Sequence, residues 1–136
     1  MQLACAAAAA VNGGYYYRPR LVSEIRSADG AVSEEIPVTL KNRTIGEQAS
    51  RTLASLLEGV LKNGSGSKAY IEGYKIGGKT GTAQKFENGA IAQGKYVSSF
   101  LGFFPANDPQ YLALVIVDEP QGAYYGSVVA APAARE

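Results

Sequence analysis

The sequence has no histidine, a single cysteine and no long hydrophobic run. Without histidine the chain cannot hold a Ser-His-Asp or Cys-His catalytic site, or a zinc motif that uses histidine. One cysteine, Cys5, permits no internal disulfide and no cysteine cluster. We therefore expect no metal and no cofactor. The apolar stretch from Leu3 to Val11 is too short to span a membrane, which takes about 20 residues.

The composition is that of an ordinary globular protein. Of the 136 residues, 46% are hydrophobic and 18% are charged, and the net charge is +1. Because no block of like charge occurs, neither nucleic acid nor an anionic membrane surface is an expected partner. We expect a soluble chain with one modest core.

Two segments have the pattern of α-helices. Residues 2–11 are rich in alanine and leucine, which have the best helix propensities. A second helix is expected at 46–62, after a capping box formed by Thr44 and Glu47. Its apolar residues predict a single buried stripe, made of Leu53, Leu56, Leu57, Val60 and Leu61. An alanine-rich helix is also expected from Gly126 to the end.

The rest of the chain is strand-like, so the sequence predicts an α+β fold. A peripheral hairpin is expected at 15–40, with a two-residue turn at Asp29-Gly30. A three-stranded antiparallel sheet is expected within 74–117, at residues 74–84, 96–104 and 111–117. The last of these strands is apolar on both faces, which is typical of a central strand covered on both sides.

The segment Gly73–Thr80 matches the phosphate-binding P-loop pattern, G-x-x-x-x-G-K-[ST]. A P-loop nucleotide-binding protein is therefore one alternative. The motif requires a buried strand before it and a helix after it. Here the segment before the motif is short and is polar at both ends. After the lysine, Thr80, Gly81 and Thr82 are poor helix formers. The flanking sequence does not favour this alternative.

The other interpretation places Lys79-Thr80-Gly81-Thr82 along an edge strand. A lysine, two hydroxyls and a glycine make a compact anion site. Strand alternation puts Lys79 and Gly81 on one face and Thr80 and Thr82 on the other. The glycine permits close approach of a peptide backbone.

The residues around this motif resemble the C-terminal part of the transpeptidase domain of class B penicillin-binding proteins, of the division or sporulation type. Gly78-Lys79-Thr80-Gly81-Thr82-Ala83-Gln84 is similar to the signature strand of that family. The resemblance extends in order over nearly all of the chain. Its other segments are Gln2–Ala4, Val11–Gly14, Tyr17–Val22, Leu57–Val60, Gly64–Gly66, Ser99–Pro105, Val117–Pro120, Tyr125–Gly126 and Ala130–Pro132.

The resemblance implies a partial penicillin-binding transpeptidase fold, similar to the serine β-lactamases. It implies acyl transfer on D-Ala-D-Ala stem peptides of peptidoglycan, with β-lactams reacting at the same serine. Lys79 would supply positive charge, and the hydroxyls of Thr80 and Thr82 would bind the substrate carboxylate. The Thr82 backbone amide would be one oxyanion-hole donor, and Gly81 would let the acyl chain lie against the strand. The family acts at the bacterial cell envelope, on the extracytoplasmic face of the cytoplasmic membrane.

The two other motifs of that family, S-x-x-K and S-x-N, are missing. Ser65-Gly66-Ser67-Lys68 matches the first by letters but lies in a glycine-rich link, where no helix would aim a nucleophile. We therefore expect a fragment of a transpeptidase domain over 1–136 that is inactive alone. Met1 and Glu136 each interrupt a helix. We therefore expect a fragment of an enzyme rather than a natural non-catalytic module that binds peptidoglycan or a protein. The sheet of the resembled family has five strands, so an exposed edge and homo-oligomers are also expected.

Overall fold

The computed structural model describes all 136 residues, which form two compact units, Met1–Ser50 and Arg51–Glu136. The helix α2 (Glu47–Asn63) begins in the first unit and continues into the second. Helices and antiparallel sheets occur together, so the predicted α+β class is confirmed. None of the helices combines the length and the apolar character that crossing a membrane requires.

The first unit starts with the predicted helix α1 (Gln2–Val11), which an Asn-Gly-Gly turn ends. The side-chain oxygen of Asn12 accepts the Tyr15 N–H at 2.9 Å, and its amide nitrogen donates to the Tyr15 carbonyl at 2.8 Å. Gly14 has a φ of +93°, and a Cβ there would overlap the Ile45 carbonyl. Glycine is therefore required where the chain turns back from the helix.

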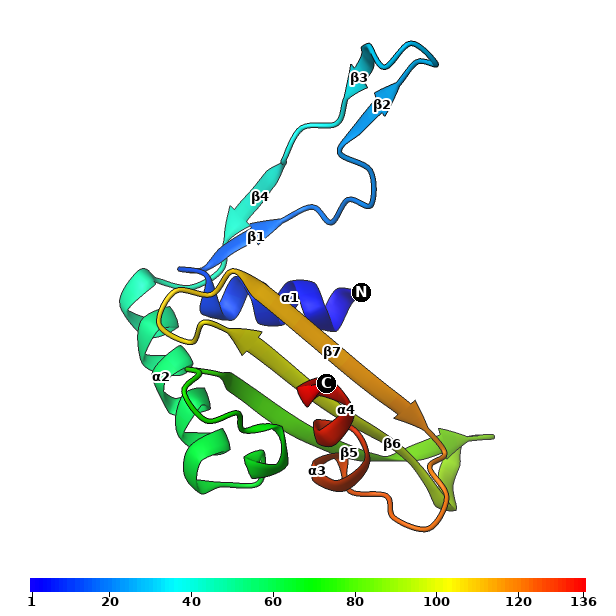
Figure 1. Ribbon diagram of the computed structural model, residues 1–136. Helices are drawn as coiled ribbons and strands as arrows, with labels where there is room; N and C mark the ends of the chain where they lie inside the picture. Colours follow the sequence, from blue (N-terminus) through cyan, green and yellow to red (C-terminus); the bar gives the residue numbers. More distant parts are fainter. The chain divides into compact units, whose positions relative to one another are not determined.

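Two short antiparallel ribbons follow in the first unit and succeed each other along one arm (Figure 1). The inner one pairs β1 (Tyr15–Tyr17) with β4 (Leu40–Arg43). The outer one pairs β2 (Glu24–Arg26) with β3 (Val32–Glu35). The β4 strand was not predicted, because it contains a single apolar residue and so no polar and apolar alternation.

The turn between β2 and β3 differs from the prediction. Gly30 N–H donates to the Ser27 carbonyl, and Ser27 N–H donates to the Ala31 carbonyl, both at 2.9 Å. This makes a three-residue loop with Gly30 at φ +85° in place of a two-residue turn at Asp29-Gly30. A type I turn closed by a left-handed glycine has this arrangement.

The start of α2 is also different from the prediction. Its first helical hydrogen bond runs from Ser50 N–H to the Gly46 carbonyl at 3.1 Å, so Gly46 is the N-cap. Thr44 therefore lies two residues before the N-cap. Its hydroxyl donates to the Gly14 carbonyl at 3.1 Å, which ties the helix approach to the turn after α1.

Only part of the predicted apolar stripe of α2 is buried. Leu61 is 1% exposed, whereas Leu56 is 66% exposed. At about 100° per residue these two side chains lie roughly 140° apart around the helix. Ala54, which the prediction did not include, is buried in place of Leu56.

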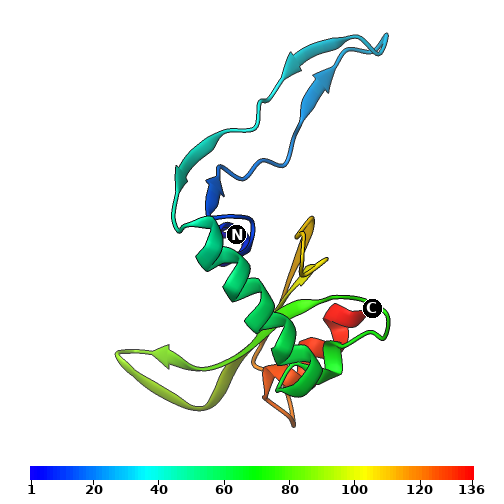
Figure 2. The same ribbon diagram turned by 90° about the vertical axis from the view of Figure 1, so that its left-hand side faces the viewer.

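The second unit is built on a three-stranded antiparallel sheet, as predicted, in the order β5-β6-β7. Its strands are β5 (Gly77–Glu87), β6 (Ala90–Phe104) and β7 (Tyr111–Asp118). Asn88 and Gly89, at φ 51° and 80°, form the two-residue turn between β5 and β6. Pairing of β6 with β7 begins at Val97, so the outer half of the β5–β6 hairpin extends beyond β7 (Figure 2).

The position of β7 corrects the prediction for residues 111–117. This strand lies at an edge of the sheet, and β6 lies at the centre. Phe100 and Phe103 on β6 are 1% and 2% exposed, while Ile116 on β7 is 56% exposed. An apolar run therefore did not identify the buried strand here, because the burial of a strand depends on what pairs with it.

Three short helical segments pack on one face of this sheet (Figure 1). They are η1 (Ser67–Ala69), α3 (Gly126–Val129) and α4 (Ala131–Arg135). The expected C-terminal helix is thus divided in two, and Pro132 lies at the start of α4, where its missing N–H is tolerated. The core beneath consists of Leu61, Ala69, Phe100, Ala130 and Ala131.

Candidate functional site

The K-T-G-T residues lie in the first half of β5, at an edge of the sheet. Their partners on β6 are, in order, Leu101, Phe100, Ser99 and Ser98. This regular pairing gives the alternation expected from the sequence, with Lys79 and Gly81 on one face and Thr80 and Thr82 on the other. The strand also excludes the P-loop alternative, because no helix follows Lys79 and Thr80 to direct amides at a phosphate.

Each threonine hydroxyl of the motif has a partner from another segment. Thr80 Oγ1 lies 3.2 Å from Ser65 Oγ, in the link after α2. Thr82 Oγ1 accepts a hydrogen bond from Gly126 N–H, at the start of α3, at 3.0 Å. Because this bond occupies an acceptor position of Thr82, its hydroxyl proton remains available to a negatively charged acceptor.

The sequence did not identify Ser65 and Gly126 as neighbours of the motif. The glycines before and after Ser65 suggested only a flexible link. In the structure, Gly66 N–H donates to the Val60 carbonyl at 3.2 Å, which holds this link against the end of α2. Gly126 can be recognised only from the fold, because a Cβ there would overlap the carbonyls of Gly81 and Ser99.

Lys79 supplies the positive charge of this strand. Its Nζ donates to the Thr80 carbonyl at 2.8 Å, and it takes part in none of the ion pairs of the chain. A cation without a carboxylate partner is suited to bind an anion.

Gly81 allows the strand to be approached closely. A Cβ at this position would lie 2.5 Å from Ser99 Oγ on the neighbouring strand. Gly81 therefore adds no side chain to the face of the strand that Lys79 shares. Such an open edge can receive an extended peptide.

Three serines of the chain have hydrogen-bond partners other than a base. Ser50 Oγ accepts the Gly13 N–H at 2.9 Å, and Ser98 Oγ donates to the Tyr124 carbonyl. Both residues are fully buried. Ser65 is bonded to Thr80 and not to Lys68, and it lies in the turn before the 3₁₀ helix Ser67–Ala69. A serine nucleophile needs a base within hydrogen-bond reach.

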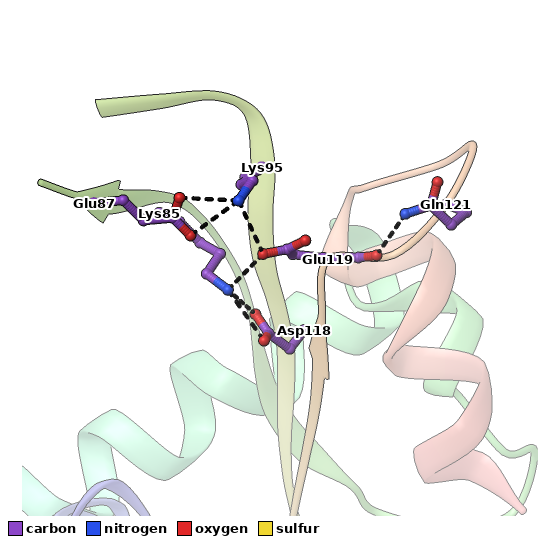
Figure 3. Close-up of polar contacts among 6 residues, drawn as sticks. All are labelled: Lys85, Glu87, Lys95, Asp118, Glu119 and Gln121. Atoms are coloured by element: carbon purple, nitrogen blue, oxygen red, sulfur yellow. Dashed lines mark hydrogen bonds and ion pairs between the residues drawn. The ribbon is translucent and has the colours of Figure 1, made fainter. Parts of the chain in front are cut away.

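A charged cluster lies near the motif, where β7 ends beside the β5–β6 hairpin (Figure 3). Lys85 Nζ contacts Glu119 at 2.7 Å and Asp118 at 3.1 Å. Lys95 Nζ contacts Glu87 at 2.9 Å and Glu119 at 3.7 Å. The hydrogen bond to Glu119 is the main cause that raises the pKa of Lys85, and the same bond lowers the pKa of Glu119. No pattern in the sequence predicted this cluster.

The comparisons with known proteins point in one direction. The family described as "Penicillin binding protein transpeptidase domain" matches residues 1–136. The chain is 40% identical over 135 residues to stage V sporulation protein D of Bacillus subtilis, covering 97% of this chain and 21% of that protein. It is 38% identical over 118 residues to a peptidoglycan D,D-transpeptidase FtsI homolog of Chlorokybus atmophyticus, covering 85% of this chain and 16% of that protein.

Solved structures show the same similarity in three dimensions. Apo penicillin binding protein 3 from Mycobacterium tuberculosis matches 98% of this chain with a TM-score of 0.85 and 28% identity. The same protein in complex with ampicillin matches with a TM-score of 0.83 and 26% identity. In both comparisons the chain spans 32% of the solved chain. It therefore spans only a minor part of the length of the proteins that it resembles.

Proposed function

The chain belongs to the penicillin-binding protein transpeptidase family, and we propose that it supplies the substrate-binding strand, but not the nucleophile, of a peptidoglycan D,D-transpeptidase. The observation that carries the proposal is the geometry of β5. An unpaired lysine and two oriented hydroxyls lie on an exposed edge strand, in a chain that matches the family over its whole length.

We propose that this strand binds the carboxylate of a D-Ala-D-Ala stem peptide, or that of a β-lactam. Lys79 provides the charge, and Thr80 and Thr82 donate hydroxyl protons to the carboxylate oxygens. The hydrogen bond from Gly126 N–H to Thr82 Oγ1 supports this role, because it leaves the Thr82 proton free. Gly81 allows the acyl chain to lie along the strand.

The chemistry assigned to the site is acyl transfer. A serine oxygen attacks the carbonyl of the penultimate D-alanine, and the terminal D-alanine leaves as the acyl-enzyme forms. An amine of a second stem peptide then attacks the ester carbonyl, which forms the cross-link and releases the serine. The Thr82 backbone amide is proposed to stabilise the oxyanion formed in each step.

The serine and its lysine are proposed to come from residues outside this sequence. Three serines of the chain, Ser50, Ser65 and Ser98, have hydrogen-bond partners other than a base, which supports this proposal. The relatives are cell-wall synthesis proteins, which agrees with a location at the cell envelope. We propose that the complete enzyme acts on the extracytoplasmic face of the cytoplasmic membrane.

The first test is labelling of the purified chain with a fluorescent penicillin. We expect no covalent label, while penicillin binding protein 3 from M. tuberculosis, which has been solved with ampicillin, serves as the labelled reference. Covalent, saturable labelling of the chain would show that it holds a nucleophile and would overturn the proposal of inactivity.

The second test asks whether the strand works beside a complete site. Residues 2–135 replace the matching segment of penicillin binding protein 3, and acylation by the fluorescent penicillin is measured. We expect the chimera to be labelled, and Lys79→Ala to lower the second-order acylation constant on the order of 10²-fold. Lys41→Ala, a lysine of β4 outside the site, is the matched control and should have no effect.

Two further outcomes complete this experiment. A chimera that unfolds cooperatively but is not labelled would contradict the proposed function and favour a non-catalytic binding module. A chimera in which Lys79→Ala and Lys41→Ala acylate equally fast would contradict the role of Lys79.

A further inference from the structure

The loop Glu119–Tyr125, which follows β7, is attached to the root of the β5–β6 hairpin by charged side chains. Lys85 of β5 lies 2.7 Å from Glu119, and Lys95 of β6 lies 3.7 Å from the same carboxylate oxygen. Figure 3 shows Lys85 and Lys95 converging on Glu119 from neighbouring strands. The side chain of Lys85 is 22% exposed, so this contact is partly shielded from water.

Backbone and aromatic contacts fasten the same loop. Glu119 has a φ of 48°, in the left-handed region that residues with a side chain seldom adopt. Its N–H donates to the Tyr96 carbonyl at 2.9 Å. The ring of Tyr96 stacks on that of Tyr124, with centroids 4.1 Å apart and planes at 11°. Ser98 Oγ donates to the Tyr124 carbonyl, so three contacts, two at Tyr96 and one at Ser98, hold the loop to β6.

The loop ends where the motif begins. Gly126 directly follows Tyr125, and its N–H is the donor to Thr82 Oγ1 at 3.0 Å. Its backbone lies so close to the carbonyls of Gly81 and Ser99 that a Cβ would not fit. Any displacement of the loop therefore moves the one group that orients the Thr82 hydroxyl.

We propose that Lys85, Glu119 and Tyr124 are positioning residues that hold the Glu119–Tyr125 loop and thereby orient Thr82 toward the carboxylate of the ligand. This rests on the proposed function of the K-T-G-T strand. None of the three touches the ligand, and each acts through Gly126. Lys62 and Glu58 form an ion pair of the same length, 2.7 Å, but lie four residues apart on α2 and fix no loop.

The test is amide hydrogen exchange on the purified 136-residue chain, followed residue by residue by NMR. Lys85→Met removes the charge and keeps the aliphatic stem. We expect the Gly126 amide to exchange about threefold to tenfold faster, which corresponds to the loss of two partly exposed ion pairs. Lys85→Arg should restore exchange to within about twofold of the native rate, because it restores the donor. Glu119→Gln, like Lys85→Met, should make the Gly126 amide exchange faster.

The matched control is Lys62→Met, which should leave the Gly126 amide unchanged. Unchanged Gly126 exchange in both Lys85→Met and Glu119→Gln would overturn the proposal. Equal acceleration in Lys85→Met and Lys62→Met would overturn it too, since the effect would then be a general loss of stability.

The consequence for the ligand is measured in the chimera with penicillin binding protein 3. Lys85→Met should lower the second-order acylation constant about threefold, and Lys85→Arg should restore it. If Lys85→Met speeds Gly126 exchange but leaves the second-order acylation constant at its native value, the loop is purely structural and does not orient Thr82 for the ligand. If the chimera with the native residues is not acylated, the proposed function fails, while the exchange data still decide whether Lys85 and Glu119 orient Gly126.

Discussion

At the scale of single residues, the site depends on places where two backbones lie against each other without a side chain between them. Gly81 and Gly126 are such residues, and Gly126 N–H reaches Thr82 Oγ1 at 3.0 Å because of it. Lys79 and Thr80 were predicted from the motif together with the resemblance of the residues around it. Ser65 and Gly126 were not, because nothing in their local sequence says which residue they meet.

Gly77, at the start of β5, offers a test of this close packing. A Cβ at this position would lie 2.7 Å from Cε1 of Phe103, whose side chain is buried. Gly77→Ala should therefore lower the free energy of unfolding by about 1–3 kcal/mol, because the ring cannot move without disturbing the core. Chemical denaturation measures the effect.

The control for Gly77→Ala is Gly59→Ala, in the middle of α2. Apart from the backbone of the helix itself, a Cβ at Gly59 would meet no atom within 4 Å. This substitution should raise the free energy of unfolding by about 0.5–1 kcal/mol, because alanine favours the helix. Equal effects of the two substitutions would contradict the steric argument.

At the scale of elements, apolar patterns located the helices and strands but misjudged which sides are buried. The apolar strand β7 is at the edge of the sheet, and Leu56 of α2 faces solvent. Both errors have one cause. Periodicity reports that a face is apolar, whereas the neighbours that cover a face are set by the arrangement of the chain.

The two leucines of α2 provide a matched pair. Leu61 lies in the core with Phe100, whereas Leu56 is largely exposed. Leu61→Ala should lower the free energy of unfolding by about 2–5 kcal/mol, because it leaves a cavity. Leu56→Ala should change it by less than about 0.5 kcal/mol. Thermal or urea unfolding of both variants checks the prediction, and equal losses would contradict the observed orientation of α2.

The contact between β5 and the loop after β7 should depend on pH. The hydrogen bond from Lys85 lowers the pKa of Glu119 below its ordinary value of 4.5, and the pKa of Lys85 is raised above 10.5. The stabilisation is therefore present between these two values. It is lost as pH falls through the lowered pKa of Glu119, or as pH rises through the raised pKa of Lys85.

Glu119→Gln isolates this contribution. The native chain should have the higher melting temperature at about pH 7, and the difference should disappear in acid as Glu119 becomes protonated. Lys95, which also faces Glu119, and Asp118, which pairs with Lys85, remain in both proteins. A difference that persists unchanged well below pH 4.5 would contradict the assignment.

At the scale of the whole molecule, the sheet of the second unit has two edges, β5 and β7. β5 carries the charged side chains of Lys79 and Lys85, which oppose pairing with a second copy of the chain. β7 carries no charge before Asp118, and Ile116 is 56% exposed. We therefore propose that copies of this chain associate through β7.

Light scattering over a range of concentrations tests this association. We expect a mass above that of the monomer that rises with concentration. Ile116→Lys should lower it, because a charge on an edge strand opposes pairing. Leu21→Lys, at a residue that is 93% exposed on the arm of the first unit, controls for a general gain in solubility. A constant monomer mass, or equal effects of the two substitutions, would rule out association through β7.

The sequence by itself determined the α+β class, the two main helices, the three strands of the sheet and the position of the K-T-G-T residues on an edge strand. These properties depend on local propensity and on the order of short motifs. Only the tertiary structure decided that β7 is an edge strand, and that Ser65, Gly126, Lys85 and Glu119 belong around the motif. The physical reason is distance along the chain, since Thr82 and Gly126 are 44 residues apart and Lys85 and Glu119 are 34 apart. Contacts of this range exist only after the chain has folded, so no local pattern records them.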